Sequence, residues 1–182
     1  MSTSGVAVTV WASRNPHKPV RTHSRTNTRI NESAHTAWPV WAHHCSMELD
    51  KALEFVRANP RAVLLTYRPD GGPQMSPVIV GVDSEGYVVV STRETAIKTR
   101  NIRQNPQVGF CVFTEGFFGP WVQLEGRAEI VSLPDAMDHL IAYYRGISGE
   151  HPDWDDYRSA MEREQRVIVR VALDRAGPDL HG

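Results

Sequence analysis

The chain has 182 residues and a formal net charge of −1, and 41% of its residues are hydrophobic. This length suits one domain of about 130 residues with a tail, and the balanced charge gives no sign of a nucleic-acid partner. No apolar run approaches the roughly 20 residues that a membrane-spanning helix needs. The two cysteines, Cys45 and Cys111, form no CxxC pair. This argues against a disulfide scaffold or a zinc ribbon and favours a reducing, cytoplasmic environment.

Residues 1–46 differ in composition from the rest. They hold five basic residues against one acidic residue, Glu32, together with five of the eight histidines and three of the five tryptophans. Such a polar, aperiodic segment is typical of disorder. A transit-like leader or a nucleic-acid arm are other interpretations, whereas the lack of a long apolar stretch argues against a secretory signal. We expect a disordered extension, or an upstream start with Met47 as the true initiator, and a folded domain over residues 47–182.

The first element expected after Met47 is a helix, because Leu49, Leu53 and Val56 recur at helical spacing. Asn59-Pro60 ends that helix. Runs of β-branched and apolar residues, separated by turns with Gly, Asp and Pro, then predict strands. The expected strands span residues 62–67, 74–82, 87–91, 108–114, 121–131 and 167–173. In the strand at 121–131, Val122, Leu124, Gly126, Ala128 and Ile130 alternate with polar residues and should face the core.

Three more helices are expected. The first is basic and amphipathic, carries Lys98, and ends at Asn105-Pro106. Pro134 suits the first turn of a helix that continues to residue 144. The last helix spans residues 153–163, and its first-turn aspartates should cap and charge its N-terminus. Sequential hairpins with few helices predict a mainly β, α+β fold in which an antiparallel sheet closes into a barrel.

Residues 91–106 carry the pattern that points most clearly to a ligand. A β-rich run reaches the Ser91 hydroxyl, and Lys98 follows on the first turn of the basic helix. The free N–H groups of a helix N-terminus and a neighbouring lysine suit a phosphate. The alternative is an ordinary solvated helix, since Lys and Arg are surface residues by default.

No catalytic motif is present: the chain lacks GxSxG, HExxH and GxGxxG. His139 and His151 have no second histidine at ligand spacing, so no metal site is predicted. Trp121 starts a strand directly after a Gly-Pro pair. It is either a rim residue that closes the barrel end or a residue that stacks on a cofactor.

Over residues 48–173 the chain resembles the pyridoxamine 5'-phosphate oxidase-like split β-barrel flavoproteins, and most of all their actinobacterial branch that binds the deazaflavin coenzyme F420. The resemblance rests on a leading helix and then, in order, on RAVLLTYRPDGGPQMSPV, STRETAIKTRN, WVQLEGRAEIV and GEHPDWDDYRSAM. It implies an antiparallel, FMN-binding-like split β-barrel with flanking helices. It also implies a homodimer with the cofactor in a cleft at the subunit interface.

The resemblance implies cofactor-binding residues but no catalytic side chain, because the cofactor itself performs the hydride chemistry. The phosphate would be held by Ser91 and Lys98, with the backbone of Ile97 and Thr99 and the side chain of Arg103. The ring would lie against the strand Met75, Ser76 and Pro77, and the partner subunit would supply Gly119, Pro120 and Trp121. One departure weakens the phosphate contact: Ala96 stands where relatives carry an arginine. The chain also lacks an aromatic residue expected near its C-terminus.

The expected function is therefore that of an F420-dependent oxidoreductase, which transfers a hydride between reduced deazaflavin and a small organic acceptor. An FMN-dependent oxidoreductase is the alternative, since both cofactors have a ribityl phosphate and a tricyclic ring. F420 is favoured mainly by the resemblance. Its lactyl-oligoglutamate tail needs an open basic channel, which Arg93, Arg100 and Arg103 are placed to line, whereas FMN needs a tighter phosphate cage that Ala96 weakens. A non-catalytic F420 carrier and a haem-utilisation protein, with His139 or His151 as axial ligand, are further alternatives. We expect no nucleic-acid or membrane partner.

Overall fold

The computed structural model describes residues 47–116 and 118–181, so the prediction for residues 1–46 lies outside the described part of the chain. Its seven strands form one sheet in the order β2-β1-β5-β6-β7-β4-β3, and every neighbouring pair is antiparallel. The strands are β1 (Arg61–Tyr67), β2 (Pro73–Ile79), β3 (Gly81–Val82), β4 (Val88–Arg93), β5 (Gln107–Phe113), β6 (Pro120–Val131) and β7 (Arg166–His181). The helices are α1 (Leu49–Ala58), α2 (Ile97–Gln104), α3 (Ala136–Ser148) and α4 (Trp154–Arg163).

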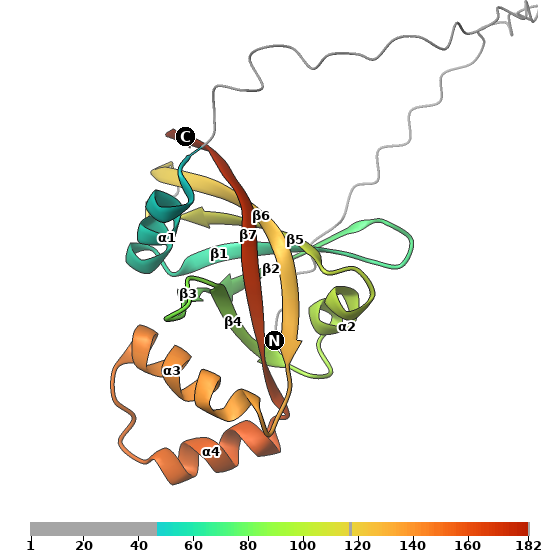
Figure 1. The fold of residues 1–182 in the computed structure, drawn as a ribbon, viewed down its shortest axis with the longest axis vertical. Coiled ribbons are helices and arrows are strands. Elements are labelled where there is room, and N and C mark those ends of the chain that lie inside the picture. Colours follow the sequence, from blue (N-terminus) through green and yellow to red (C-terminus); the bar gives the residue numbers. More distant parts are fainter. Residues whose placement is uncertain (1–46, 117, 182) are drawn as a thin grey trace, which may run out of the picture. The chain divides into compact units, whose positions relative to one another are not determined.

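The sheet curls so that its two edges meet. β2 and β3 are the edge strands, yet only Val80 separates them in the sequence. The chain therefore passes directly from one edge of the sheet to the other, and a split without a hydrogen-bonded ladder remains between β2 and β4. Figure 1 shows α1 near the C-terminal end of β7 and the α3–α4 hairpin near its other end. This architecture confirms the predicted antiparallel split β-barrel with flanking helices.

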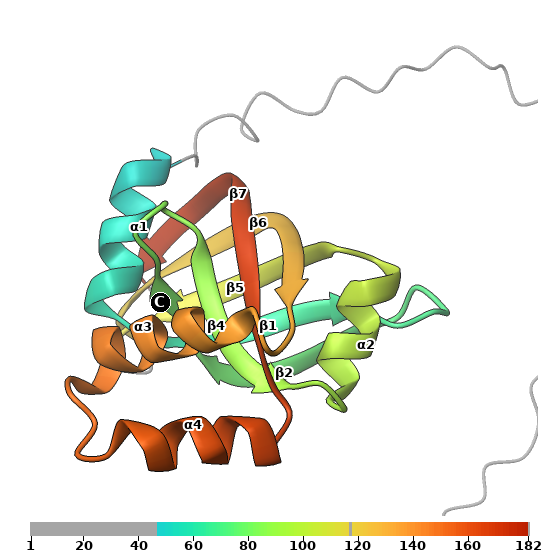
Figure 2. The ribbon, with the colours of Figure 1, turned by 60° about the horizontal axis from the view of Figure 1, so that its bottom comes forward.

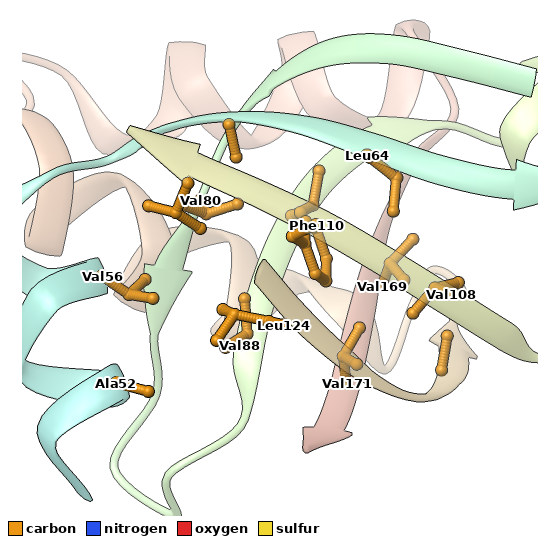
Figure 3. Packing of buried hydrophobic residues seen from close by; sticks show 14 of the residues in the cluster. Ala52, Val56, Leu64, Val80, Val88, Val108, Phe110, Leu124, Val169 and Val171 are labelled. Atoms are coloured by element: carbon orange, nitrogen blue, oxygen red, sulfur yellow. The ribbon is translucent and has the colours of Figure 1, made fainter. Parts of the chain in front are cut away.

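Alternating side chains fill the barrel. In β6, Val122, Leu124, Gly126 and Ala128 are buried while the residues that alternate with them are more exposed, as the period of two predicts. Phe110 and Leu64 are the largest fully buried side chains of the described core. Figure 3 shows the labelled core residues of five strands converging with Ala52 and Val56, which α1 turns toward them. α1 thus covers one end of the barrel with its apolar face.

Gly126 has a steric reason to be glycine. A Cβ atom at this position would collide with the backbone carbonyl oxygen of Ala172 in β7. The β6–β7 ladder shifts its register between Glu125 and Gly126, so the two backbones approach closely at this irregularity. A larger residue at position 126 would therefore disturb the pairing of β6 with β7.

A second hydrophobic cluster lies outside the barrel, where α3 and α4 pack on the outer side of β4 and β7. It joins Leu140 and Ile141 of α3 and Tyr157 of α4 to Val89 and Ile168 of the strands. Figure 2 shows α3 crossing β4, with α4 running beside it. The Asp153 side chain caps α4 by accepting hydrogen bonds from the N–H groups of residues 155 and 156, each at 3.0 Å, as expected.

Several boundaries differ from those predicted. The strand expected at 74–82 is interrupted at Val80, where the chain crosses between the two edges. β4 continues to Arg93 because it pairs with β7 over its full length, so Ser91 lies within a strand and not at its end. α3 begins at Ala136, after a cis peptide bond before Pro134, and ends at Ser148, directly before Gly149, whose φ is 81°. β7 runs well beyond residue 173, because residues 175–176 and 179–181 pair with the first half of β6.

Within the described residues, none of the helices combines the length and the apolar character that crossing a membrane requires.

Candidate functional site

The split between β2 and β4 opens into a cavity of about 650 Å³, here called the split cleft. This volume falls in the range of roughly 300–1,000 Å³ that small-molecule sites occupy. One wall comes from β2 and β4, another from the turn before α2 and from α2 itself, and a third from α3 and α4. The lining residues are Pro77, Val78, Ile79, Ser91, Thr92, Arg93, Thr95, Ala96, Lys98, Tyr143, Tyr144, Tyr157, Met161 and Arg166.

The lining of the split cleft is cationic. It includes Arg93, Lys98 and Arg166, while none of the described lining residues is acidic. Lys98 is half-buried and makes no ion pair or hydrogen bond with any residue that the structure describes. Burial lowers the pKa of its ammonium group below the ordinary value, since desolvation disfavours the charged form. An anionic ligand would supply the missing counter-charge.

The N-terminus of α2 also faces this site with unused donors. Ala96 is the N-cap residue and offers no side-chain hydrogen bond to the helix, so the first N–H groups are left for a ligand. Thr99 is buried, and its hydroxyl donates to the Arg93 carbonyl at 2.7 Å. This bond fastens the first turn of α2 to the end of β4. The Thr99 side chain is thus structural. Neither Ile97 nor Thr99 lines the split cleft, and the phosphate contact expected from their backbone N–H groups stays a prediction.

Three of the predicted residues, Pro77, Ser91 and Lys98, meet in the split cleft. Arg103 does not line it. The Arg103 guanidinium instead contacts both Glu94 carboxylate oxygens, at 2.6 and 2.8 Å, and Ser132 at 3.1 Å. The charge of Arg103 is already balanced by Glu94, which explains why it points away from the cleft.

Met75 and Ser76 lie on β2 but face different surroundings. Met75 is 66% exposed and lines a separate hollow on the outer face of the sheet, with Val63, Leu65 and Cys111. The Ser76 Oγ is buried and has no hydrogen-bond partner among the described residues. Neither side chain lines the split cleft, so only Pro77 of this predicted triplet does.

Gly119, Pro120 and Trp121 lie at the other end of the barrel from the cleft. Trp121 pairs with Phe113 at the start of β6, whereas Ser91 pairs with Ile168, which pairs with Val131 at the end of β6. A side chain at Gly119 would collide with Thr114, which gives this glycine a structural role. In one chain these three residues cannot reach the cleft, so their predicted role depends on a second subunit.

The sequence did not identify the helical wall of the cleft. The Tyr143 hydroxyl donates to the Ile79 carbonyl at 2.9 Å and so links α3 to β2 across the split. Burial raises the pKa of Tyr143 to about 12, while a hydrogen bond from the Ser91 backbone acts in the opposite direction. Tyr157 and Met161 stand four residues apart on α4, a spacing that places them on one helix face. That spacing, inside the motif GEHPDWDDYRSAM, was the signal available in the sequence.

Behind this wall, four rings pack together. Tyr144, His151, Trp154 and Tyr157 contact one another with centroids 5.1 to 5.9 Å apart. Four of these six contacts are edge-to-face, an arrangement that aromatic rings favour. The His151 Nδ1 accepts a hydrogen bond from the Asp153 N–H at 3.0 Å. The motif therefore builds the support for the aromatic wall of the cleft.

Neither histidine proposed as a haem ligand lines the split cleft. His151 belongs to the ring cluster, and His139 lines a different cavity between α1 and α3. No group of three or more His, Cys, Asp or Glu residues placed to hold a metal ion occurs within the described residues.

Residues 49–177 match the family described as pyridoxamine 5'-phosphate oxidase. Among solved structures, a conserved hypothetical protein from Mycobacterium tuberculosis, Rv2991, superposes with a TM-score of 0.60 and 24% identity, over 74% of this chain and 86% of that one. An F420 reductase superposes at 0.54 with 23% identity, over 69% and 95%. HutZ, the haem storage protein from Vibrio cholerae, does so at 0.56 with 19% identity, over 75% and 98%. Because the family match covers most of the chain, the protein belongs to the pyridoxamine 5'-phosphate oxidase family.

Proposed function

We propose that the protein binds coenzyme F420 in the split cleft and transfers a hydride between the deazaflavin and a small organic acceptor. The observation that carries the proposal is the cleft lining, which combines three cations, no described acidic residue, and a wall of tyrosines. A flavin-like cofactor has matching chemistry, with a planar ring and an anionic chain. Structures of this fold include an F420 reductase as well as haem-binding proteins.

The bound deazaflavin would supply the hydride chemistry. The side chains of this protein would bind and orient it. Lys98 and the free N–H groups at the start of α2 suit a phosphate, and Pro77 and Ile79 of β2 offer an apolar edge to a ring. Tyr143 and Tyr157 limit the access of water from the helical side, with both hydroxyls held by backbone carbonyls.

The number of cations favours F420 over FMN. Lys98 and the helix N-terminus suffice for one phosphate, yet Arg93 and Arg166 also line the cleft. A ligand with anionic groups beyond its phosphate uses these charges, and the oligoglutamate tail of F420 provides them. FMN has a single phosphate and would leave the two arginines to share the Glu164 carboxylate, with one positive charge uncompensated.

We also propose that the active form is a homodimer. The outer face of the sheet carries a partly exposed apolar surface in which Val63 pairs with both Pro77 and Cys111, and Leu65 pairs with Met75. A second copy on this face would bury these side chains and would bring Gly119, Pro120 and Trp121 to the cleft of its neighbour. Sedimentation should then show about twice the mass of one chain. A monomer with full cofactor affinity would contradict the shared site.

The proposal is tested by equilibrium titration of the protein with F420 and with FMN, followed by fluorescence. Tighter binding of F420 supports it, and tighter binding of FMN overturns it in favour of the FMN-dependent alternative. Oxidation of reduced F420 in the presence of candidate acceptors then separates an enzyme from a non-catalytic carrier. A haem titration followed by visible absorption tests the remaining alternative.

A further inference from the structure

Two arginines of the split cleft share one carboxylate. Arg93 is the last residue of β4, Arg166 is the first residue of β7, and the two lie opposite each other in the antiparallel ladder. Glu164, which follows α4, places its Oε2 atom 3.2 Å from Nη2 of Arg93. The same oxygen is 2.8 Å from Nη2 and 3.0 Å from Nε of Arg166. Two guanidinium groups thus face one carboxylate, and one positive charge stays uncompensated.

The geometry of this cluster resembles that of an occupied carboxylate site. Arg166 directs two adjacent N–H groups, on Nε and Nη2, at one oxygen of the Glu164 carboxylate, and such charge-assisted hydrogen bonds are how guanidinium groups bind carboxylates. The Arg166 side chain is only 27% exposed, so its charge is screened less than that of a fully solvated arginine. Hydrogen bonds and charge from Arg166, and then from Arg93, hold the pKa of Glu164 below its usual value. Glu164 is therefore anionic at neutral pH.

The surroundings of the two arginines are apolar on the helical side. Tyr144, Tyr157 and Met161 line the same cleft as Arg93 and Arg166. A ligand that reached the arginines would lie with its body against these side chains. Two arginines beside an apolar wall suit a ligand with a carboxylate on an apolar or planar group. The wall would remove the apolar group from water, while the arginines would pair with the carboxylate.

We propose that Arg93 and Arg166 form a second anion subsite, specific for a carboxylate on an apolar or planar body, and that Glu164 is its built-in competitor. The subsite rests on the proposed function in that it lies in the same cleft as the phosphate contact at Lys98. An incoming carboxylate takes the place of Glu164 on the Arg166 guanidinium, and the Glu164 side chain turns to solvent. The ligand carboxylate comes either from the oligoglutamate tail of the cofactor or from the acceptor.

If Glu164 competes with the ligand carboxylate, removing its charge should strengthen ligand binding. A merely structural ion pair would not show this effect. The protein is titrated by calorimetry with benzoate, and with benzyl alcohol as the uncharged counterpart. Glu164→Gln should tighten benzoate binding several-fold, because the competitor is gone and a positive charge is freed. Arg166→Gln should weaken it about tenfold, since a charge-assisted hydrogen bond is lost. Arg127→Gln, an exposed arginine of β6 outside the cleft, should change nothing.

Benzyl alcohol should bind each variant alike, and thermal melts of all variants establish that they are folded. If folded Glu164→Gln binds benzoate no better than the parent protein, the competitor role is wrong. If Arg166→Gln leaves benzoate binding unchanged, the subsite itself is wrong.

Titration of Arg166→Gln with F420 and FMN separates the two sources of the carboxylate. A loss of F420 affinity with unchanged FMN affinity assigns the subsite to the cofactor tail. Unchanged affinity for both, with the benzoate effects retained, assigns it to a separate acceptor. An equal loss for both would place Arg166 at the phosphate and overturn the second subsite. If the parent protein binds neither cofactor, the proposed function fails, while the order of the benzoate affinities still tests the subsite.

Discussion

The barrel interior and the α3–α4 hairpin are held together by different means. The barrel core is largely aliphatic, with Leu64, Val122 and Leu124 fully buried in an alternating pattern. The hairpin cluster is rich in aromatic residues, and its tyrosine hydroxyls donate to the backbone carbonyls of Ile79 and Leu140. Aliphatic packing depends on volume, whereas the hydroxyl bonds fix particular orientations. The barrel therefore serves as a frame, and the hairpin sets the shape of the ligand-facing wall.

Truncation in the barrel should have the largest effect. Leu124→Ala removes a side chain with no exposed surface from the centre of β6. We expect a loss of about 3 kcal/mol in the free energy of unfolding, because a cavity replaces the buried methyl groups. Urea denaturation measures this loss. A loss below about 1 kcal/mol would show that the barrel tolerates repacking and would remove the contrast with the hairpin.

Lys98→Ala should act on ligand affinity and not on the fold. Loss of the charged phosphate contact should weaken F420 binding roughly ten- to hundred-fold, equivalent to about 1.5–3 kcal/mol. The melting temperature should stay unchanged, since Lys98 makes no ion pair or hydrogen bond with the described residues. Arg127→Ala, an exposed cation outside the cleft, is the control. Equal F420 affinities for Lys98→Ala and the parent protein would show that α2 is an ordinary solvated helix without a phosphate-binding role.

Tyr157→Phe should have a moderate effect, confined to the hairpin. The change removes the hydroxyl that donates to the Leu140 carbonyl at 3.0 Å, and one such bond contributes about 1 kcal/mol. We expect a loss of that size in the free energy of unfolding, together with weaker F420 binding as the aromatic wall loosens. Tyr67→Phe is a suitable control, because its hydroxyl bonds to none of the described residues. If the two variants behaved alike, the hydroxyl bonds of the hairpin would not be what holds the wall.

The last effect should appear only in alkaline solution. The folded pKa of Tyr143 is raised to about 12 from an ordinary value of 10.0, so the folded protein retains a proton that the unfolded chain releases. The contribution of this group to stability is fully present below pH 10 and is lost as the pH rises through 10 to 12. Tyr143→Phe should flatten the fall in the free energy of unfolding over this window. If the free energy of unfolding fell equally in Tyr143→Phe and in the parent protein, the Tyr143 hydroxyl would be in contact with water.

The sequence predicted the strands of the barrel better than the wall that the α3–α4 hairpin gives to the cleft. The alternation in residues 121–131 has a period of two that survives in β6, because one face of that strand is buried. The second half of β7 was missed, since Gly177 and Pro178 are poor strand residues, and only the pairing of the residues on either side of them with β6 extends the strand. The break at Val80 was equally invisible, because it depends on the closure of the sheet.

The candidate site was likewise predicted only in part. Ser91 and Lys98 were found because a hydroxyl and a lysine around a helix N-terminus form a local pattern, whereas Pro77 was implied only by the family resemblance. Tyr143, Tyr157 and Arg166 were missed, because in the sequence they read as residues of a packed helix or a strand end. They become cleft residues only when the α3–α4 hairpin docks beside the split. The roles of Gly119, Pro120 and Trp121 depend on a second chain, and they stay predictions.

The open edge of β2 has a consequence for how the protein behaves at high concentration. An unpaired strand edge is a template for strands of other molecules, and natural sheets guard such edges with proline. β2 carries two prolines, Pro73 and Pro77, and neither has an N–H group to offer a foreign strand. We read them as protection against edge-to-edge aggregation. Pro77→Val would restore the N–H group and a β-branched side chain at that edge, and the resulting protein should self-associate and scatter light at concentrations where the parent stays clear.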